Sequence, residues 1–282
     1  MTKTELHTNI FTHSGNMGDV LAAIPALLTY YEKNNKKVHL KLIENVPAHY
    51  YQGAVHPTKD ATGKDVMLNQ KMIEMLTPLL LAQECIGEVS TIQHDDVIAD
   101  PDYKTKYFHL EWIRETNVGM PALCINRWYF YVFPDLSRDL TKPWLSVPDA
   151  DKDFAKGKII ISRSERYRNP SINYEFLKKH EDECVFIGTI REWNQFCMAF
   201  DLQIEKLKVD NFLELAQAIK QSRFHITNQT MANQISTGIV HPAILETCTF
   251  APNCIINGPN RYDFLSQMGL EFYFNELYKL TK

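Results

Sequence analysis

A turn of small and polar residues, followed by an apolar helix pattern, contains the first side chain that could do chemistry. Residues 13–28 read HSGNMGDVLAAIPALL, and Asp19 stands where the turn meets the helix. The turn before it contains Ser14, Gly15, Asn16 and Gly18. Small residues let the backbone turn sharply and approach a ligand closely. Asp19 could be the general base of an active site, or it could only offset the dipole of the helix.

Three arginines follow a predicted strand in the second half of the chain. The strand is KIIIS (158–162), and Arg163, Arg166 and Arg168 come directly after it. The planar fork of arginine pairs with phosphate oxygens in bidentate fashion. Three arginines at the carboxyl edge of a sheet would suit a diphosphate. The alternative is an ordinary charged loop in solvent.

A second predicted strand, RFHIT (223–227), runs into a polar turn and a helix N-terminus. The turn residues are Thr227, Asn228, Gln229 and Thr230. Backbone N–H groups at a helix N-terminus bind anions, although Asn228 or Thr230 could equally be a plain N-cap. Glu246, in HPAILETC, could accept hydrogen bonds from a ribose. Otherwise it is a solvated helix residue.

The elements that must position these side chains alternate between strand and helix. NIFTH (9–13) predicts a strand, and KVHLKLIEN (37–45) alternates as a half-buried strand does. Between them, one helix face collects Val20, Leu21, Ile24, Leu27, Leu28 and Tyr31. Pro25 lies inside this pattern and should kink the helix or limit its first turns. A strand, a helix and a strand in this order predict a parallel α/β sheet.

The second half repeats this rhythm after a segment with two prolines and several charges, residues 140–153. Strands are expected at 158–162, 184–188 and 223–227. Helices are expected at 171–180, 190–200 and 210–222, the last capped by Asp210. Residues 261–280 predict an amphipathic terminal helix. We therefore place a domain boundary near residue 150.

The composition is that of a globular protein and excludes several classes. The 282 residues are 45% hydrophobic and 23% charged, with a net charge of −4, so no global basic field attracts nucleic acid or lipid. The six cysteines form no CxxC pair and the histidines no HExxH, which argues against a metal site. GxGxxG and the Walker pattern are absent. With neither a signal peptide nor an apolar run of roughly 18 residues, we expect a cytoplasmic protein.

Together these segments resemble the ADP-heptose heptosyltransferases. The N-terminal motif of that family is Ser or Gly, a short gap, Gly-Asp and a helix containing Pro-Ala-Leu, and SGNMGDVLAAIPALL is similar to it. The second half is similar in order: a strand, a basic segment, a strand, the helix of VDNFLELAQAI and a strand ending in a polar turn. The resemblance implies an α/β fold of the GT-B type, with two Rossmann-like domains facing across a cleft.

The resemblance also implies which domain binds which substrate. Residues 1–150 would bind the acceptor, 151–265 the sugar nucleotide, and the helix of 266–282 would cross back to the first domain or simply dock. Asp19 would be the general base, with the turn of residues 14–18 beside it. The donor site would contain Arg163, Arg166, Arg168, Thr227, Asn228, Gln229, Thr230 and Glu246.

The implied reaction moves a sugar from a nucleotide-diphosphate sugar to an acceptor hydroxyl, on a glycan by preference, with inversion. Arginines and helix N-termini would stabilise the leaving diphosphate, so no metal or other cofactor would be required. This chain departs from the family at the polar turn, where Asn228-Gln229-Thr230 and Asn233 replace Asp-Ser/Thr-Gly and a later His. The sugar and acceptor need not be those of the family.

Three other functions stay open at this point. The acceptor could be a modified base in phage DNA. GNMGD also resembles the glycine-Asp turn of polysaccharide pyruvyl transferases, whose donor is phosphoenolpyruvate. Finally, the missing His would suit a non-catalytic module that binds a nucleotide sugar without turning it over.

Overall fold

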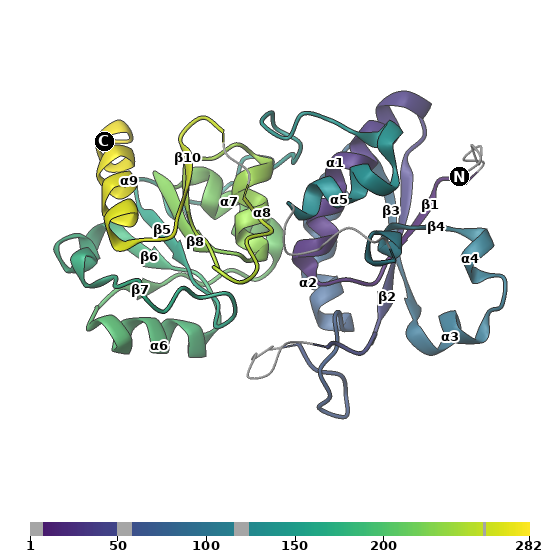
Figure 1. Cartoon of the computed structure of the whole chain (residues 1–282), viewed down its shortest axis with the longest axis horizontal. Coiled ribbons are helices and arrows are strands. Elements are labelled where there is room, and N and C mark those ends of the chain that lie inside the picture. Colours follow the sequence, from purple (N-terminus) through teal and green to yellow (C-terminus); the bar gives the residue numbers. More distant parts are fainter. Residues whose placement is uncertain (1–7, 50–57, 116–123, 256–257) are drawn as a thin grey trace. The chain divides into compact units, whose positions relative to one another are not determined.

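The chain forms two compact units (Figure 1). The computed structural model describes residues 8–49, 58–115, 124–255 and 258–282. Unit 1 is Met1–Val118 with Asn126–Arg138, and unit 2 is Gly119–Ile125 with Asp139–Lys282.

The segment after Arg138 packs onto unit 2, so the units divide before the boundary near 150 that the prolines indicate. The backbone N–H groups of Trp144 and Leu145 both donate to the carbonyl of Gly238. Both side chains are buried. Position 238 requires glycine, because a Cβ there would lie only 2.5 Å from the Cβ of Leu145.

The described part of unit 1 contains a sheet of parallel strands in the order β3-β2-β1-β4. The strands are β1 (Ile10–His13), β2 (Val38–Glu44), β3 (Ile86–Gln93) and β4 (Phe108–His109). The helices are α1 (Met17–Asn34), α2 (Gln70–Leu81), α3 (His94–Ala99), α4 (Tyr103–Lys106) and α5 (Ile125–Val132), with 3-10 segments η1 (Leu110–Arg114) and η3 (Pro134–Leu136). The predicted strand, turn, helix and strand at the N-terminal end are all present.

Helix α1 forms because its apolar residues recur on one face, and that face is buried. Val20, Leu21, Ile24 and Leu27 are fully inaccessible to solvent. The helix continues through Pro25 to Asn34. Pro25 therefore does not limit the helix to its first turns.

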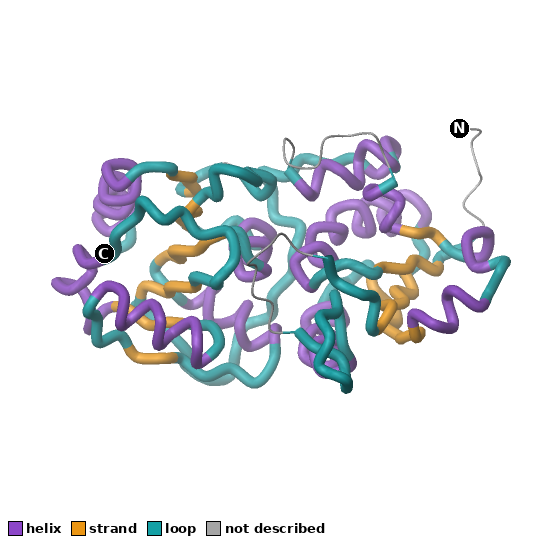
Figure 2. The backbone as a smooth tube through the Cα atoms, turned by 60° about the horizontal axis from the view of Figure 1, so that its bottom comes forward, coloured by secondary structure: helices purple, strands orange, loops and turns teal. Residues whose placement is uncertain are grey.

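Unit 2 contains a larger parallel sheet in the order β10-β9-β8-β5-β6-β7, and its strands run side by side among helices in Figure 2. The strands are β5 (Ile159–Ser162), β6 (Cys184–Phe186), β7 (Glu205–Lys206), β8 (Phe224–Asn228), β9 (Ala243–Glu246) and β10 (Arg261–Phe264). The helices are η4 (Glu175–Glu183), α6 (Ile190–Phe200), α7 (Phe212–Gln221), α8 (Met231–Gly238) and α9 (Gln267–Leu280).

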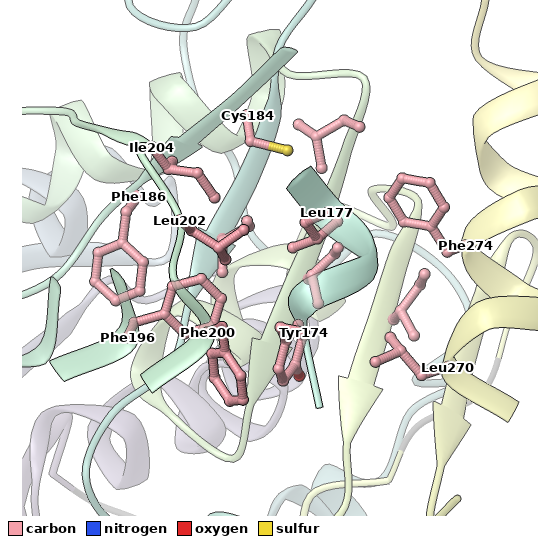
Figure 3. Packing of buried hydrophobic residues seen from close by; sticks show 14 of the residues in the cluster. Tyr174, Leu177, Cys184, Phe186, Phe196, Phe200, Leu202, Ile204, Leu270 and Phe274 are labelled. Carbon is pink, nitrogen blue, oxygen red and sulfur yellow. The ribbon is translucent and has the colours of Figure 1, made fainter. Parts of the chain in front are cut away.

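The main core of unit 2 lies on one face of this sheet, under η4, α6 and α9 (Figure 3). Aromatic rings fill it: Tyr174 packs against Phe196 and Phe200 with ring centroids 5.2 and 5.3 Å apart. From α9, Leu270 and Phe274 reach the same core, and Phe274 contacts Phe224 of β8. The terminal helix is therefore docked on unit 2.

Four details of unit 2 differ from the prediction. Residues 261–264, expected to begin the terminal helix, form the strand β10, and α9 starts only at Gln267. Residues 175–183 form a 3-10 helix, and Asn211 rather than Asp210 caps α7, because its side chain accepts from the N–H of Glu214 at 3.0 Å. Glu246 ends a strand and is fully buried, so it is not a solvated helix residue. The strand β9 lies between β8 and β10, which explains its unbroken apolar run AIL.

Candidate active site

The turn between β1 and α1 places Asp19 in the first turn of the helix, as predicted. The backbone N–H of Asn16 donates to Asp19 Oδ2 at 3.3 Å, so the carboxylate caps the N-terminus of α1. A Cβ on Gly15 would lie 2.8 Å from Asp19 Oδ2 and 2.8 Å from Cε1 of His13. Position 15 therefore favours glycine, because the side chains of Asp19 and His13 fill the space that a Cβ would occupy. Gly18 is the second residue of α1.

Arg114 holds the Asp19 carboxylate from the end of a neighbouring strand. Because β4 pairs with β1 and η1 follows β4 directly, the two segments meet at the carboxyl edge of the sheet. Arg114 Nη2 donates to Asp19 Oδ2 at 2.5 Å, and its Nε donates to Glu111 Oε2 at 2.7 Å. The carboxylate of Asp19 is the main reason that the pKa of Arg114 is raised. Side chains of Asp19 and Arg114 are 16% and 36% exposed, so solvent reaches both.

A buried histidine and a buried tyrosine hold the backbone of Asp19. The N–H of Gly15 donates to His13 Nδ1 at 2.9 Å, and Glu111 Oε1 lies 3.0 Å from the same nitrogen. Nε2 donates to the Tyr129 hydroxyl at 2.8 Å, and that hydroxyl donates to the carbonyl of Asp19 at 2.9 Å. Burial lowers the pKa of His13. These hydrogen bonds hold the backbone of Asp19 in place.

Sequence reasoning missed Glu111, Arg114 and Tyr129. One signal was available: HLEWIRE places Glu111 and Arg114 three residues apart, just after a short strand. The carboxylate of Glu111 also accepts from the backbone N–H of Ser14. The turn residues predicted beside Asp19 are thus engaged largely with the protein itself.

In unit 2, Arg163 and Glu246 form an ion pair inside the protein. They are 7% and 0% exposed. Arg163 Nε donates to Glu246 Oε2 at 2.6 Å and Nη2 donates to Oε1 at 2.8 Å. The remaining acceptor positions take the Tyr174 hydroxyl at 2.8 Å and the N–H of Asn169 at 2.6 Å. The pair anchors the loop of residues 163–169.

The polar turn after β8 is also mostly engaged with the protein. Asn228 is fully buried: its Oδ1 accepts from the N–H of Ser164 at 3.0 Å, and its Nδ2 donates to the carbonyl of Arg166 at 2.7 Å. Gln229 donates to the carbonyl of Ala251 at 2.6 Å. Thr227 is 1% exposed and donates to the carbonyl of Asn228 at 2.9 Å.

Three of the predicted donor residues keep accessible side chains: Arg166, Arg168 and Thr230. Thr230 is the N-cap of α8, and within the described residues its side chain makes no capping hydrogen bond. The first N–H groups of a helix lack partners inside the helix, so this end of α8 can accept an anion. Arg168 Nε donates to the carbonyl of Ser164 at 2.8 Å, which holds it at the same edge. The arrangement suits a diphosphate.

The part of the chain that the structure describes lacks two features. No helix there is long and apolar enough to cross a membrane. No group of three or more His, Cys, Asp or Glu side chains in that part of the chain could hold a metal ion.

Comparison with known proteins shows the same fold in a group of glycosyltransferases. No protein-family model matches the sequence, and no curated protein matches it. A family 9 glycosyltransferase from Veillonella parvula superposes with a TM-score of 0.58 at 10% identity, over 95% of this chain and 88% of that one. E. coli ADP-heptose LPS heptosyltransferase II gives 0.58 at 11% identity, over 96% and 98%. E. coli heptosyltransferase WaaC, solved with ADP-2-deoxy-2-fluoro heptose, gives 0.57 at 9% identity, over 95% and 98%.

These likenesses, together with two parallel sheets covered by helices, show that the chain has the α/β fold of GT-B glycosyltransferases. The α/β fold of the GT-B type that the resemblance implies is confirmed. Identities near 10% carry the fold only, so the activity is argued from the site.

Proposed function

We propose that the protein is an inverting glycosyltransferase that moves a sugar from a nucleotide-diphosphate sugar to an acceptor hydroxyl. The observation that carries this proposal is the N-terminus of α8. This helix follows β8, and within the described residues the side chain of its N-cap, Thr230, makes no capping hydrogen bond, so the first N–H groups can bind another acceptor. Arg166 and Arg168 lie on the adjacent loop after β5. That is a site for a diphosphate.

Asp19 is the proposed general base. Its carboxylate would take the proton of the acceptor hydroxyl while the hydroxyl oxygen forms a bond to the anomeric carbon. The bond from that carbon to the diphosphate oxygen breaks, and its electron pair leaves with the diphosphate. A single displacement of this kind inverts the anomeric configuration. Arg114 orients the carboxylate, and the Tyr129 hydroxyl donates to the backbone carbonyl of Asp19 and fixes its position.

The charge that develops on the diphosphate would be stabilised by the protein itself. The guanidinium groups of Arg166 and Arg168 and the N-terminal dipole of α8 place positive charge where the negative charge forms. The proposed reaction therefore needs neither a metal ion nor another cofactor.

A glycan hydroxyl is the proposed acceptor, and a modified base in DNA is the alternative. The salt dependence of acceptor binding distinguishes the two acceptors. A DNA acceptor binds through phosphates, so its affinity should fall steeply with salt concentration, with a log–log slope of about −0.9 per neutralised phosphate. A neutral glycan acceptor should show a slope near zero.

A nucleotide screen tests the donor site. We expect one of ADP, GDP, CDP, UDP or dTDP to stabilise the protein in a thermal shift assay; ADP is the first choice because the heptosyltransferase neighbours were solved with ADP-containing ligands. A ligand at 100 times its Kd stabilises by about 2.7 kcal/mol, which is roughly 5 °C in Tm for a chain of this size. Arg166→Ala should remove the shift. Arg127→Ala, which changes an exposed arginine of unit 1, should retain it.

The same screen separates the other functions. If no nucleotide binds and phosphoenolpyruvate does, the protein is a pyruvyl transferase. If a nucleotide sugar binds but neither hydrolysis nor transfer is detected with any acceptor, it is a binding module. Nucleotide binding that survives in Arg166→Ala would contradict the site as placed here.

A further inference from the structure

Two adjacent side chains of the polar turn each hold a different loop at the carboxyl edge of the unit 2 sheet. Asn228 binds the carbonyl of Arg166 at 2.7 Å, in the loop after β5. Gln229 binds the carbonyl of Ala251 at 2.6 Å, and its Oε1 accepts from the N–H of Cys248 at 2.6 Å, in the loop after β9. The turn that precedes α8 therefore sets the positions of both flanking loops.

These loops bring two aromatic rings together beside the N-terminus of α8. Tyr167 directly follows Arg166, and Phe250 directly precedes Ala251. Their ring centroids lie 6.2 Å apart with an interplanar angle of 37°. Phe250 is 57% exposed, so one side of this ring pair faces solvent.

Tyr167 adopts a backbone conformation that its residue type rarely takes. Its φ of +57° lies in the left-handed region, where a bulky residue is a genuine outlier. The guanidinium of Arg166 lies over its ring, 5.6 Å from the centroid. Such strain persists only where the surroundings hold it, and it clusters at ligand sites. The hydrogen bonds from Asn228 to the neighbouring residue supply that restraint.

We propose that Tyr167 and Phe250 form an aromatic wall that stacks on a ring carried by the diphosphate bound at α8. The inference rests on the proposed function for the diphosphate itself. The shared chemistry is a flat face that an aromatic ring can cover, offered either by the nucleobase or by the apolar face of the sugar. The wall adds affinity for the organic part of the donor and none for the phosphates.

Calorimetry with three classes of probe tests the wall. The probes are inorganic pyrophosphate, the nucleoside diphosphate among ADP, GDP, CDP, UDP and dTDP that binds the wild type, and its glucose derivative. The variants are Phe250→Leu and Tyr167→Asn, since asparagine tolerates the left-handed region and removes the ring. Phe272→Leu is the matched control, because Phe272 of α9 is 60% exposed.

Stacking on an aromatic side chain changes affinity by about 5- to 150-fold. A weaker nucleoside diphosphate in both wall variants, with pyrophosphate unchanged, supports the wall and assigns the ring as the nucleobase. A loss seen only with the sugar nucleotide supports the wall and assigns the ring as the sugar. Phe272→Leu should match the wild type throughout.

Two results would overturn the wall and leave the proposed function standing: unchanged affinity for every probe, or an equal loss for pyrophosphate, which would mean that the substitutions disturb the anion site. Failure of the wild type to bind any of these probes would refute the proposed function and this inference together. A Tm equal to that of the Phe272→Leu control shows that a variant is folded.

Discussion

Arg163 and Glu246 form a bidentate ion pair that solvent barely reaches, with Nε–Oε2 at 2.6 Å and Nη2–Oε1 at 2.8 Å. The pair joins the carboxyl ends of β5 and β9, which lie on either side of β8 in the sheet. It thus braces the edge at which the proposed donor site is built. Both residues were predicted to contact the donor. In the structure their charged groups bind each other.

Removing one partner of this pair should be costly. Glu246→Gln leaves the Arg163 guanidinium buried without its counter-charge, and we expect the free energy of unfolding to fall by about 3–5 kcal/mol. The double variant Arg163→Met, Glu246→Leu should recover much of that loss. Urea unfolding measures both.

An exposed ion pair provides the control for this prediction. Asp201 pairs with Lys178 at 2.6 Å, and its side chain is 90% exposed. Asp201→Asn should therefore change stability by less than about 1 kcal/mol. A Glu246→Gln protein as stable as Asp201→Asn would show that the buried pair does not brace the fold.

Asp19→Asn should abolish most of the activity without affecting the donor. The amide keeps the size of the side chain but cannot take a proton, so we expect kcat to fall by about 10²- to 10⁴-fold. The Kd of the nucleotide should stay that of the wild type.

Glu214→Gln is a close structural match for Asp19→Asn. Glu214 also stands in the first turn of a helix, pairs with Lys152 at 2.9 Å, and is 18% exposed. We expect full activity from this variant. If both variants lose activity equally, or if Asp19→Asn turns over at the wild-type rate, Asp19 is a helix cap and not the base.

Chelation should leave the reaction unchanged. The proposal assigns stabilisation of the diphosphate to Arg166, Arg168 and the N-terminus of α8, so excess EDTA should not lower the rate of sugar transfer. The rate is compared before and after chelation, and again after Mg²⁺ and Mn²⁺ are restored. A rate that falls with EDTA and returns with a divalent cation would refute this part of the mechanism.

Two histidines of unit 2, His225 and His241, should make the fold sensitive to mild acid. Burial lowers the pKa of His225 to about 3 and that of His241 to about 4, from 6.5. Below pH 6.5 the unfolded chain takes up a proton on each histidine and the folded chain does not. The contribution of each neutral histidine to stability is therefore fully present above pH 6.5, and it is lost as the pH falls toward the pKa of that histidine in the folded protein. At about pH 5 each histidine should cost about 2 kcal/mol.

Urea unfolding at several pH values between about 7 and 5 measures this loss. In His241→Gln the dependence should become shallower by up to one proton, while His225 still contributes. His225 bonds to the hydroxyls of Ser162 at 2.7 Å and Ser236 at 2.5 Å, so its neutral form is built into the core. Stability that does not change over this range would contradict the prediction.

The sequence by itself determined the local elements and the place of Asp19 within them. Apolar residues at a period of 3.6 predict α1, and a turn of small residues before it puts Asp19 in the first helical turn. The run IIIS predicts β5 in the same way. Local patterns suffice here because hydrogen bonds and burial along a helix or strand depend on residues close in sequence.

Only the tertiary structure decided which side chains meet. Arg114 reaches Asp19 because β4 lies beside β1, and Arg163 reaches Glu246 because β8 alone separates β5 from β9. Neither order follows from the periodicity of any one segment. Strand order is settled by how helices cover the two faces of each sheet, which is a property of the whole unit. The same packing turned Asn228 from a predicted ligand into a restraint on the neighbouring loop, because buried polar groups must find partners within the protein.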